Sequence, residues 1–286
     1  MIPAEFEYFA PGSVKEAVAL LAQTPGAKLL SGGMSLIPAL KHRLVEPAAL
    51  IDIGRIPGLD QISERRGAVS LGACVTHATA AGSALLAPVS LLCETAASIG
   101  DVQVRNRGTL GGSLVHADPA ADWTATFLAL DAEARLIGPG GERTLPARDF
   151  FTGMLRSAVG EHEVVTEIRF PFERKRAGSA YRKLRQTASG FAVVGVAAQL
   201  VLDRRGRCER AAVGVTGINP VPFRAESLER RLVGHEPDDA RLETVCAEIE
   251  EADPMGDLHA SPEFRRHLLS VYARRALQAA RERASP

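Results

Sequence analysis

The segment most informative about fold and ligand class is Arg107-Gly108-Thr109-Leu110-Gly111-Gly112-Ser113. A similar glycine pair lies upstream in Ser31-Gly32-Gly33-Met34-Ser35. A glycine pair lets the backbone take positive φ and approach a ligand without a Cβ clash. Successive amides in such a turn form a concave cluster of N–H donors that suits phosphate oxygens. One such turn alone is usually an ordinary tight bend. Neither segment matches Gly-x-Gly-x-x-Gly or a loop ending in Gly-Lys-Ser/Thr, which argues against a Rossmann fold and an NTPase.

Two carboxylates follow the second segment, at the start of a predicted helix. Asp118 and Asp122 lie in His116-Ala117-Asp118-Pro119-Ala120-Ala121-Asp122-Trp123. Asp118 is either a ligand residue or only the N-cap of that helix. Asp122 is placed to accept hydrogen bonds from hydroxyls of a ligand such as a ribityl chain, and its alternative is a solvated first-turn carboxylate favoured by the helix dipole.

Small elements alternate around the two segments. Ser13 and Glu16 predict a capping box at a helix start, and 27–30 predicts a strand that enters the first glycine segment. The residues after that segment, 36–44, predict a short helix with Pro38 near its start. The other predictions here are strands at 50–53, 69–73 and 163–170, a helix cap at Thr76 and a buried helix at 91–99.

A charged stretch predicts a domain boundary. The linker is expected between Glu173 and Ser179, because it separates a glycine-rich part from a simpler one. Beyond it, 191–202 and 210–216 predict two strands, and 239–251 and 262–283 predict helices. We therefore expect an α+β protein with a first domain at 1–175, divided into subdomains at about 1–56 and 57–175, and a second domain at 179–286.

Composition limits the classes of function. The chain has 286 residues, 46% of them hydrophobic, which is enough for two cores. Because 34 basic residues balance 34 acidic ones, nothing in the overall charge favours nucleic acid or an anionic membrane. No apolar run approaches the roughly 20 residues that span a bilayer, and the N-terminus lacks the features of an export signal. A soluble, cytoplasmic protein is expected.

Metal sites are not expected in this chain. Its cysteines form no Cys-x-x-Cys pair, and its seven histidines lack metal spacing. Cys74, Cys93, Cys208 and Cys246 are widely separated, and His77 and His116 read first as loop or packing residues.

The glycine segments carry a resemblance to a known family. The chain resembles the medium, flavin-binding subunit of the xanthine dehydrogenase and aerobic carbon monoxide dehydrogenase family, from Phe6 to the C-terminal helix. The family's Ala-Gly-Gly-His-Ser corresponds to 31–35, and its Thr-Ile/Leu-Gly-Gly stands intact at 109–112. Met34 departs from the frequent histidine, which speaks against the carbon monoxide branch but leaves the backbone role of the loop intact.

The resemblance implies a set of FAD contacts. The pyrophosphate is expected on the amides of residues 32–35, and the lysine and the acid that the family places at the flavin fall on Lys183 and Asp122. Ile99 would shield the ring and Val165 would lie beside it, while His77 and Asp118 are further candidates. The residues that would line the cofactor are Lys28, Leu29, Leu30, Ser31, Gly32, Gly33, Met34, Ser35 and Leu36 in the first segment, and Thr109, Leu110, Gly111, Gly112 and Ser113 in the second.

The resemblance also implies fold and partners. The expected fold is a two-subdomain FAD-binding domain of the vanillyl-alcohol-oxidase/PCMH type, followed by a small domain with an antiparallel sheet and helices. The expected partners are a large molybdenum-cofactor subunit and a small subunit with [2Fe–2S] clusters, in a doubled heterotrimer that reduces a nicotinamide, quinone or other acceptor. No catalytic residue for hydroxylation is expected here.

Two alternatives stay open at this point. One is a self-sufficient FAD-dependent oxidase or reductase of the same fold, although no persuasive substrate acid or base is found. The other is an assembly module that has lost FAD, against which the intact Gly32, Gly33, Gly111, Gly112 and Asp122 argue.

Overall fold

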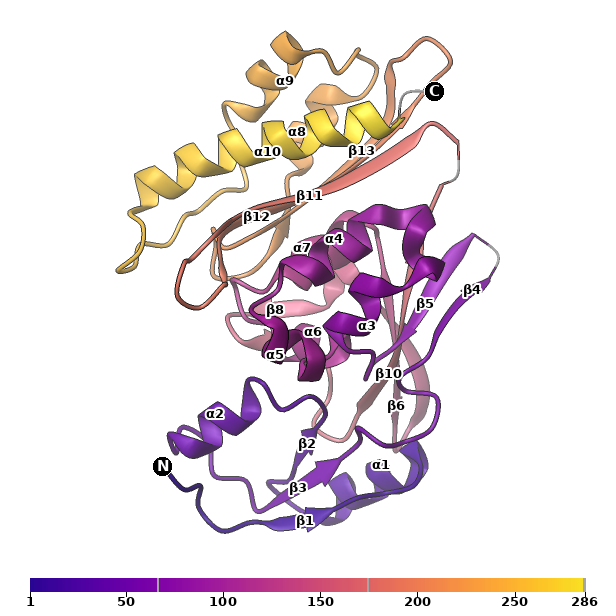
Figure 1. Ribbon diagram of the computed structural model, residues 1–286, viewed down its shortest axis with the longest axis vertical. Helices are drawn as coiled ribbons and strands as arrows, with labels where there is room; N and C mark the ends of the chain where they lie inside the picture. Colours follow the sequence, from indigo (N-terminus) through magenta and orange to yellow (C-terminus); the bar gives the residue numbers. More distant parts are fainter. Residues whose placement is uncertain (66, 174, 285–286) are drawn as a thin grey trace.

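The computed structural model describes residues 1–65, 67–173 and 175–284. Figure 1 shows three parts stacked along the long axis: a small sheet with the N-terminal segments, a larger sheet with several helices, and a last sheet covered by the long C-terminal helix. Arg174, within the expected linker, lies outside the described residues. Ala177 to Ser179, expected as the end of that linker, instead open the first strand of the last sheet.

The first part is a parallel three-stranded sheet in the order β1-β3-β2. Helix α1 begins as predicted, because Ser13 Oγ accepts from the Glu16 N–H, but the Glu16 carboxylate accepts from Gly12 N–H and not from Ser13. Ala17, Val18 and Leu21 of α1 pack on this sheet. The elements are β1 (Glu7–Phe9), α1 (Val14–Gln23), β2 (Lys28–Leu30), α2 (Leu36–Lys41) and β3 (Ala49–Asp52).

The second part is a five-stranded antiparallel sheet with helices on one face (Figure 1). Its strand order is β4-β5-β10-β6-β7, so the predicted strand at 163–170 is central. Side chains of α4 and α7, among them Trp123 and Phe127, form a core with β5 and β10. The elements are β4 (Ile62–Arg65), β5 (Ala68–Gly72), α3 (His77–Gly82), the 3-10 turn Ala84–Val89, α4 (Ser90–Ser98), α5 (Val102–Arg107), α6 (Leu110–His116), α7 (Asp122–Ala129), β6 (Glu133–Gly138), β7 (Gly141–Pro146), the 3-10 turn Ala147–Asp149, β8 (Phe151–Gly153), β9 (Arg156–Ser157) and β10 (Val164–Pro171).

The third part is an antiparallel sheet, β11-β12-β13-β14, that carries helices on both faces. Two glycines let the helices lie directly on the strands. A Cβ at Gly178 would lie 2.0 Å from Ala280 O of α10, and a Cβ at Gly214 would lie 2.0 Å from Ala125 O of α7. The elements are β11 (Ala177–Arg185), β12 (Ala192–Leu202), β13 (Cys208–Thr216), β14 (Phe223–Arg224), α8 (Glu226–Leu232), α9 (Asp239–Cys246) and α10 (Pro262–Ala284).

Candidate flavin site

The two glycine segments meet where the first and second parts join. Ser31 Oγ lies 3.0 Å from Thr109 Oγ1 and 3.2 Å from Cys74 Sγ. A Cβ at Gly32 would lie 2.1 Å from Arg107 O, so only glycine permits this approach. The structure thus joins segments that are 78 residues apart in sequence.

The first segment presents unused backbone donors. Gly33 has φ +76°, the positive φ that its sequence predicts. Among the residues that the structure describes, none accepts a hydrogen bond from the backbone N–H groups of residues 32–35, while Ile37 N–H donates to Gly33 O at 2.9 Å. Met34 and Ser35 are exposed. A run of amides without protein acceptors suits the oxygens of a pyrophosphate.

The second segment differs from its prediction. It is a loop only as far as Thr109, because helix α6 begins at Leu110 with Thr109 as its N-cap. Its amides are already used: Leu110 N–H donates to Val75 O, Gly111 N–H to Ala73 O and Gly112 N–H to Thr109 Oγ1. A Cβ at Gly111 would lie 2.6 Å from Ala73 Cβ. Gly111 therefore serves close packing, and the predicted cluster of free amides does not form at residues 110–113.

His77 lies behind the second segment. It is 4% exposed, and its backbone N–H donates to Gly108 O at 3.0 Å. Its ring Nδ1 accepts a hydrogen bond from Trp123 Nε1 at 3.0 Å. Burial, helped by the nearby Arg105, lowers the pKa of His77 to about 4. The ring is consequently neutral, with its proton on Nε2, and it supports the turn at Gly108.

Asp122 and Lys183 form a buried ion pair. The side chains are 4% and 5% exposed, with Lys183 Nζ 2.8 Å from Asp122 Oδ1. Tyr181 Oη donates to the same carboxylate oxygen at 2.5 Å, and Lys183 Nζ also donates to Ser98 O at 3.1 Å. Burial raises the pKa of Asp122, and Lys183 and Tyr181 oppose that rise. The alternative reading of Asp122 as a solvated first-turn carboxylate is therefore wrong, and Lys183 is likewise withdrawn from solvent.

The remaining predicted residues take different places. Asp118 is not the N-cap of α7, which is Ala121; its Oδ1 accepts from Ala120 N–H at 2.8 Å in the preceding turn. Ile99 follows α4 directly, next to the Ser98 carbonyl that binds Lys183. Val165 is buried in β10 at an irregularity of the strand pairing. The structure thus gathers Ile99, Asp122 and Lys183, and leaves Asp118 in a neighbouring turn.

Sequence reasoning missed Tyr181 and Glu94. The alternation of Tyr181 and Lys183 along a strand could have placed both on one face, but Arg182 and Arg185 give the run the look of a solvated basic surface. Glu94 carries no pattern that points to β11. Its Oε2 accepts from Tyr181 N–H at 2.9 Å, which only the folded chain reveals.

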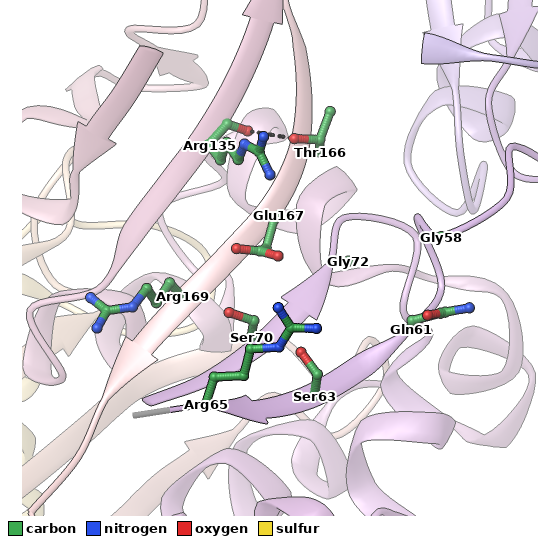
Figure 2. Close-up of a pocket in the computed structure, with 10 residues that line it drawn as sticks. All are labelled: Gly58, Gln61, Ser63, Arg65, Ser70, Gly72, Arg135, Thr166, Glu167 and Arg169. Carbon is green, nitrogen blue, oxygen red and sulfur yellow. Dashed lines mark hydrogen bonds between the residues drawn. The ribbon is translucent and has the colours of Figure 1, made fainter. Parts of the chain in front are cut away.

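A separate polar cavity of about 590 Å³ lies on the opposite face of the five-stranded sheet. Figure 2 shows the side chains of Ser70 and Glu167 near one another among the residues that line it. Ser70 alternates along β5 with the core residues Val69 and Leu71, so this cavity faces away from the glycine segments. Its Arg135 pairs with Glu142. This cavity is therefore distinct from the candidate flavin site.

A glycine turn with free amides lies against the start of α6, where the first and second parts join, and this arrangement suits a phosphate-bearing ligand. Residues 4–173 match the family model described as FAD binding domain in molybdopterin dehydrogenase, and residues 179–280 match the CO dehydrogenase flavoprotein C-terminal domain. The chain belongs to this family of FAD-binding subunits.

Individual relatives agree over nearly the whole chain. The carbon monoxide dehydrogenase medium chain of Hydrogenophaga pseudoflava is 39% identical over 98% of this chain and 98% of its own length. The 6-hydroxypseudooxynicotine dehydrogenase complex subunit alpha of Paenarthrobacter nicotinovorans is 32% identical over 100% of this chain and 98% of its own length. In structure, the chain is similar to carbon monoxide dehydrogenase from Hydrogenophaga pseudoflava, with a TM-score of 0.96, 38% identity and 100% of both chains covered.

These findings confirm the predicted family, the fold class, FAD as the cofactor and an oxidoreductase subunit as the kind of protein. Across the described residues, no helix has the length and apolar character needed to cross a membrane. Within the same residues, no group of three or more His, Cys, Asp or Glu side chains is placed to hold a metal ion.

Proposed function

We propose that this protein is the flavin-carrying medium subunit of a molybdenum-containing hydroxylase or dehydrogenase complex. It passes electrons from a partner's [2Fe–2S] clusters through FAD to an external acceptor. The observation that carries the proposal is the row of N–H groups at residues 32–35, which lack an acceptor in the described chain and lie at the junction of two subdomains. Because the chain belongs to the FAD-binding family, FAD is the phosphate-bearing ligand that we assign to that row of N–H groups.

The site residues then divide into three proposed tasks. The amides of residues 32–35 hold the pyrophosphate, with the residues from Lys28 to Leu36 and from Thr109 to Ser113 along the cofactor. FAD supplies the redox chemistry when bound. Ile99 and Val165 provide apolar walls for the ring, and Lys183 provides a fixed positive charge that favours an electron-rich ring. Asp122 keeps that charge in place through the 2.8 Å ion pair.

The proposed assembly follows the division of labour in the family. A large subunit with the molybdenum cofactor hydroxylates the substrate, a small subunit carries [2Fe–2S] clusters, and the heterotrimer is doubled, in the cytoplasm. The acceptor is a small molecule or a quinone. In this proposal the domains are 1–175, with subdomains at about 1–56 and 57–175, and 179–286, and the large subunit chooses the substrate.

FAD binding by glycine variants tests the cofactor site. In Gly33→Ala, an added Cβ lies 3.0 Å from Ile37 Cγ1 at a φ of +76°, so the free amides lose their arrangement. Gly234→Ala is the matched control, because its φ is +83° and nothing lies within 4 Å. Titration of the FAD-free chain with FAD, followed by flavin fluorescence, should show an affinity loss of about tenfold or more in Gly33→Ala only. Equal losses in both variants would contradict the proposed site.

Purification from the native host tests the partners. A yellow protein that carries a large molybdenum subunit and a small iron–sulfur subunit with it would support the electron-transfer role. A yellow chain that runs alone and turns over a substrate would instead support the self-sufficient flavoenzyme.

A further inference from the structure

The ion pair of Asp122 and Lys183 is built from three elements that are far apart in sequence. Asp122 opens α7, Lys183 lies on β11, and Ser98 ends α4. Both charged side chains are at most 5% exposed. Removing two charges from water is costly unless their geometry and remaining hydrogen bonds compensate. The groups that fix this geometry therefore decide whether Lys183 keeps its position.

Tyr181 supplies a further hydrogen-bond donor to the Asp122 carboxylate. It is 4% exposed, and its hydroxyl donates to Asp122 Oδ1 at 2.5 Å. Room for this hydroxyl comes from Gly195 on the next strand, where a Cβ would lie 2.3 Å from Tyr181 Oη. Lys183 pairs with Gly195 across the two strands, so tyrosine, lysine and glycine share one face of the sheet.

Helix α4 holds the same strand at two points. Glu94 Oε2 accepts from Tyr181 N–H at 2.9 Å, and Ser98 O accepts from Lys183 Nζ at 3.1 Å. Four residues of helix rise about 6 Å and two residues of strand about 6.6 Å, so the two spacings match. The other carboxylate oxygen of Glu94 accepts from Arg283 near the end of α10. Hydrogen bonds thus hold β11 to α4 at two points beside the ion pair, and Glu94 also links α4 to α10.

We propose that Tyr181 is a positioning residue, which acts through Asp122 to hold the Lys183 ammonium at the flavin site. The identity of the ligand as a flavin rests on the proposed function. The positioning of Lys183 by Tyr181 rests on the geometry alone. The Tyr181 hydroxyl donates to the carboxylate, so its effect on FAD passes through the ion pair. Without its hydroxyl, the buried carboxylate loses a donor and the lysine loses a fixed partner.

The first test is the chemical reactivity of Lys183 in the full chain without FAD. An amine-acetylating reagent followed by mass spectrometry measures the labelling rate of Lys183 against the exposed Lys15. Since a hydrogen bond to a charged group is typically worth one to two factors of ten in an equilibrium, Tyr181→Phe should speed Lys183 labelling about tenfold or more. Tyr272→Phe, on α10 and packed against the core of the last sheet, is the control and should leave the rate unchanged. An unchanged Lys183 rate in Tyr181→Phe would overturn the proposal.

A variant that unfolds would speed the labelling of every lysine. If Lys15 and the exposed Lys41 changed together with Lys183, Glu94→Gln would be measured in place of Tyr181→Phe. This variant keeps the hydroxyl and weakens the anchor of the strand. Selective acceleration at Lys183 would support the proposal, and none would overturn it.

The second test links positioning to FAD. In Tyr181→Phe, the FAD dissociation constant should rise about tenfold, and it should rise further as the pH falls from 8 to 6, because Asp122 with fewer donors takes up a proton more readily. The other charged groups beside the pair on the packed elements are Glu94, Arg105, Arg182, Arg185 and Arg283. A purely structural role would give a loss that does not change with pH, which would overturn the proposal. Failure of the wild-type chain to bind FAD would instead refute the proposed function, while the labelling result still decides the positioning.

Discussion

Lowering the pH should destabilise this protein through His77. Its pKa is about 4 in the folded chain, against 6.5 ordinarily, because the ring is buried. Between these values the unfolded chain binds a proton on His77 and the folded chain does not, so this contribution to stability is full above pH 6.5 and is lost as the pH falls toward 4. With 1.36 kcal/mol for each pKa unit, the whole loss is about 3 kcal/mol, of which about 2 kcal/mol has gone at pH 5.

Urea unfolding at pH 7.5 and pH 5.0 measures this loss, followed by the fluorescence of Trp123, which is the single tryptophan and donates to His77. His77→Gln is the matched control, because its amide oxygen can accept the same hydrogen bond and does not titrate. All other groups titrate alike in both proteins. The wild type should therefore lose about 2 kcal/mol more than the variant between the two pH values. Equal losses would refute the neutral, buried state of His77.

Two further predictions concern the contacts that join the segments. Gly32→Ala sets a Cβ 2.1 Å from Arg107 O, so it should separate the two glycine segments and lower the thermal unfolding temperature by several degrees, while Gly82→Ala, with nothing within 4 Å, should leave it nearly unchanged. Lys183→Met leaves the Asp122 carboxylate buried without its cation, and should cost about 3–5 kcal/mol in urea unfolding. Adding Asp122→Asn should recover part of that loss, and no recovery would speak against the buried pair.

Local patterns predicted the elements whose causes are local. The side-chain caps at Ser13 and Thr76 both form, since each satisfies a nearby N–H of its own helix, although the reciprocal bond of the predicted capping box goes to Gly12 N–H instead of Ser13. The predicted helix at 239–251 ends earlier, at Cys246, because a polar sequence gives a weak stop signal. The expected positive φ occurs at Gly33 but not at Gly111, where glycine is needed for contact with Ala73. Sequence shows that a Cβ is absent, but not which segment takes its space.

The sequence singled out candidate site residues, but it did not predict how they are arranged relative to one another. Asp122 and Lys183 were both expected at the flavin from the resemblance, yet their pairing spans 61 residues and no sequence pattern encodes it. The basic run around Lys183 resembles a solvated face, because a single chain cannot show that α4 and α7 cover that strand. Met34 was read as a departure from the carbon monoxide branch, although a carbon monoxide dehydrogenase medium chain is 39% identical overall. One side chain in an exposed loop thus weighs little against the shared fold.

The close approach of α7 to β13 at Gly214 has a consequence for how the chain unfolds. Helix α7 belongs to the core of the central part, and that core also takes in Tyr181 and Ala197 from the last sheet. One helix is therefore the inner layer of one part and the outer layer of the next. Melting either part strips apolar surface from the other, so calorimetry of the intact chain should show a single cooperative transition, and a chain cut after residue 175 should bind hydrophobic dyes.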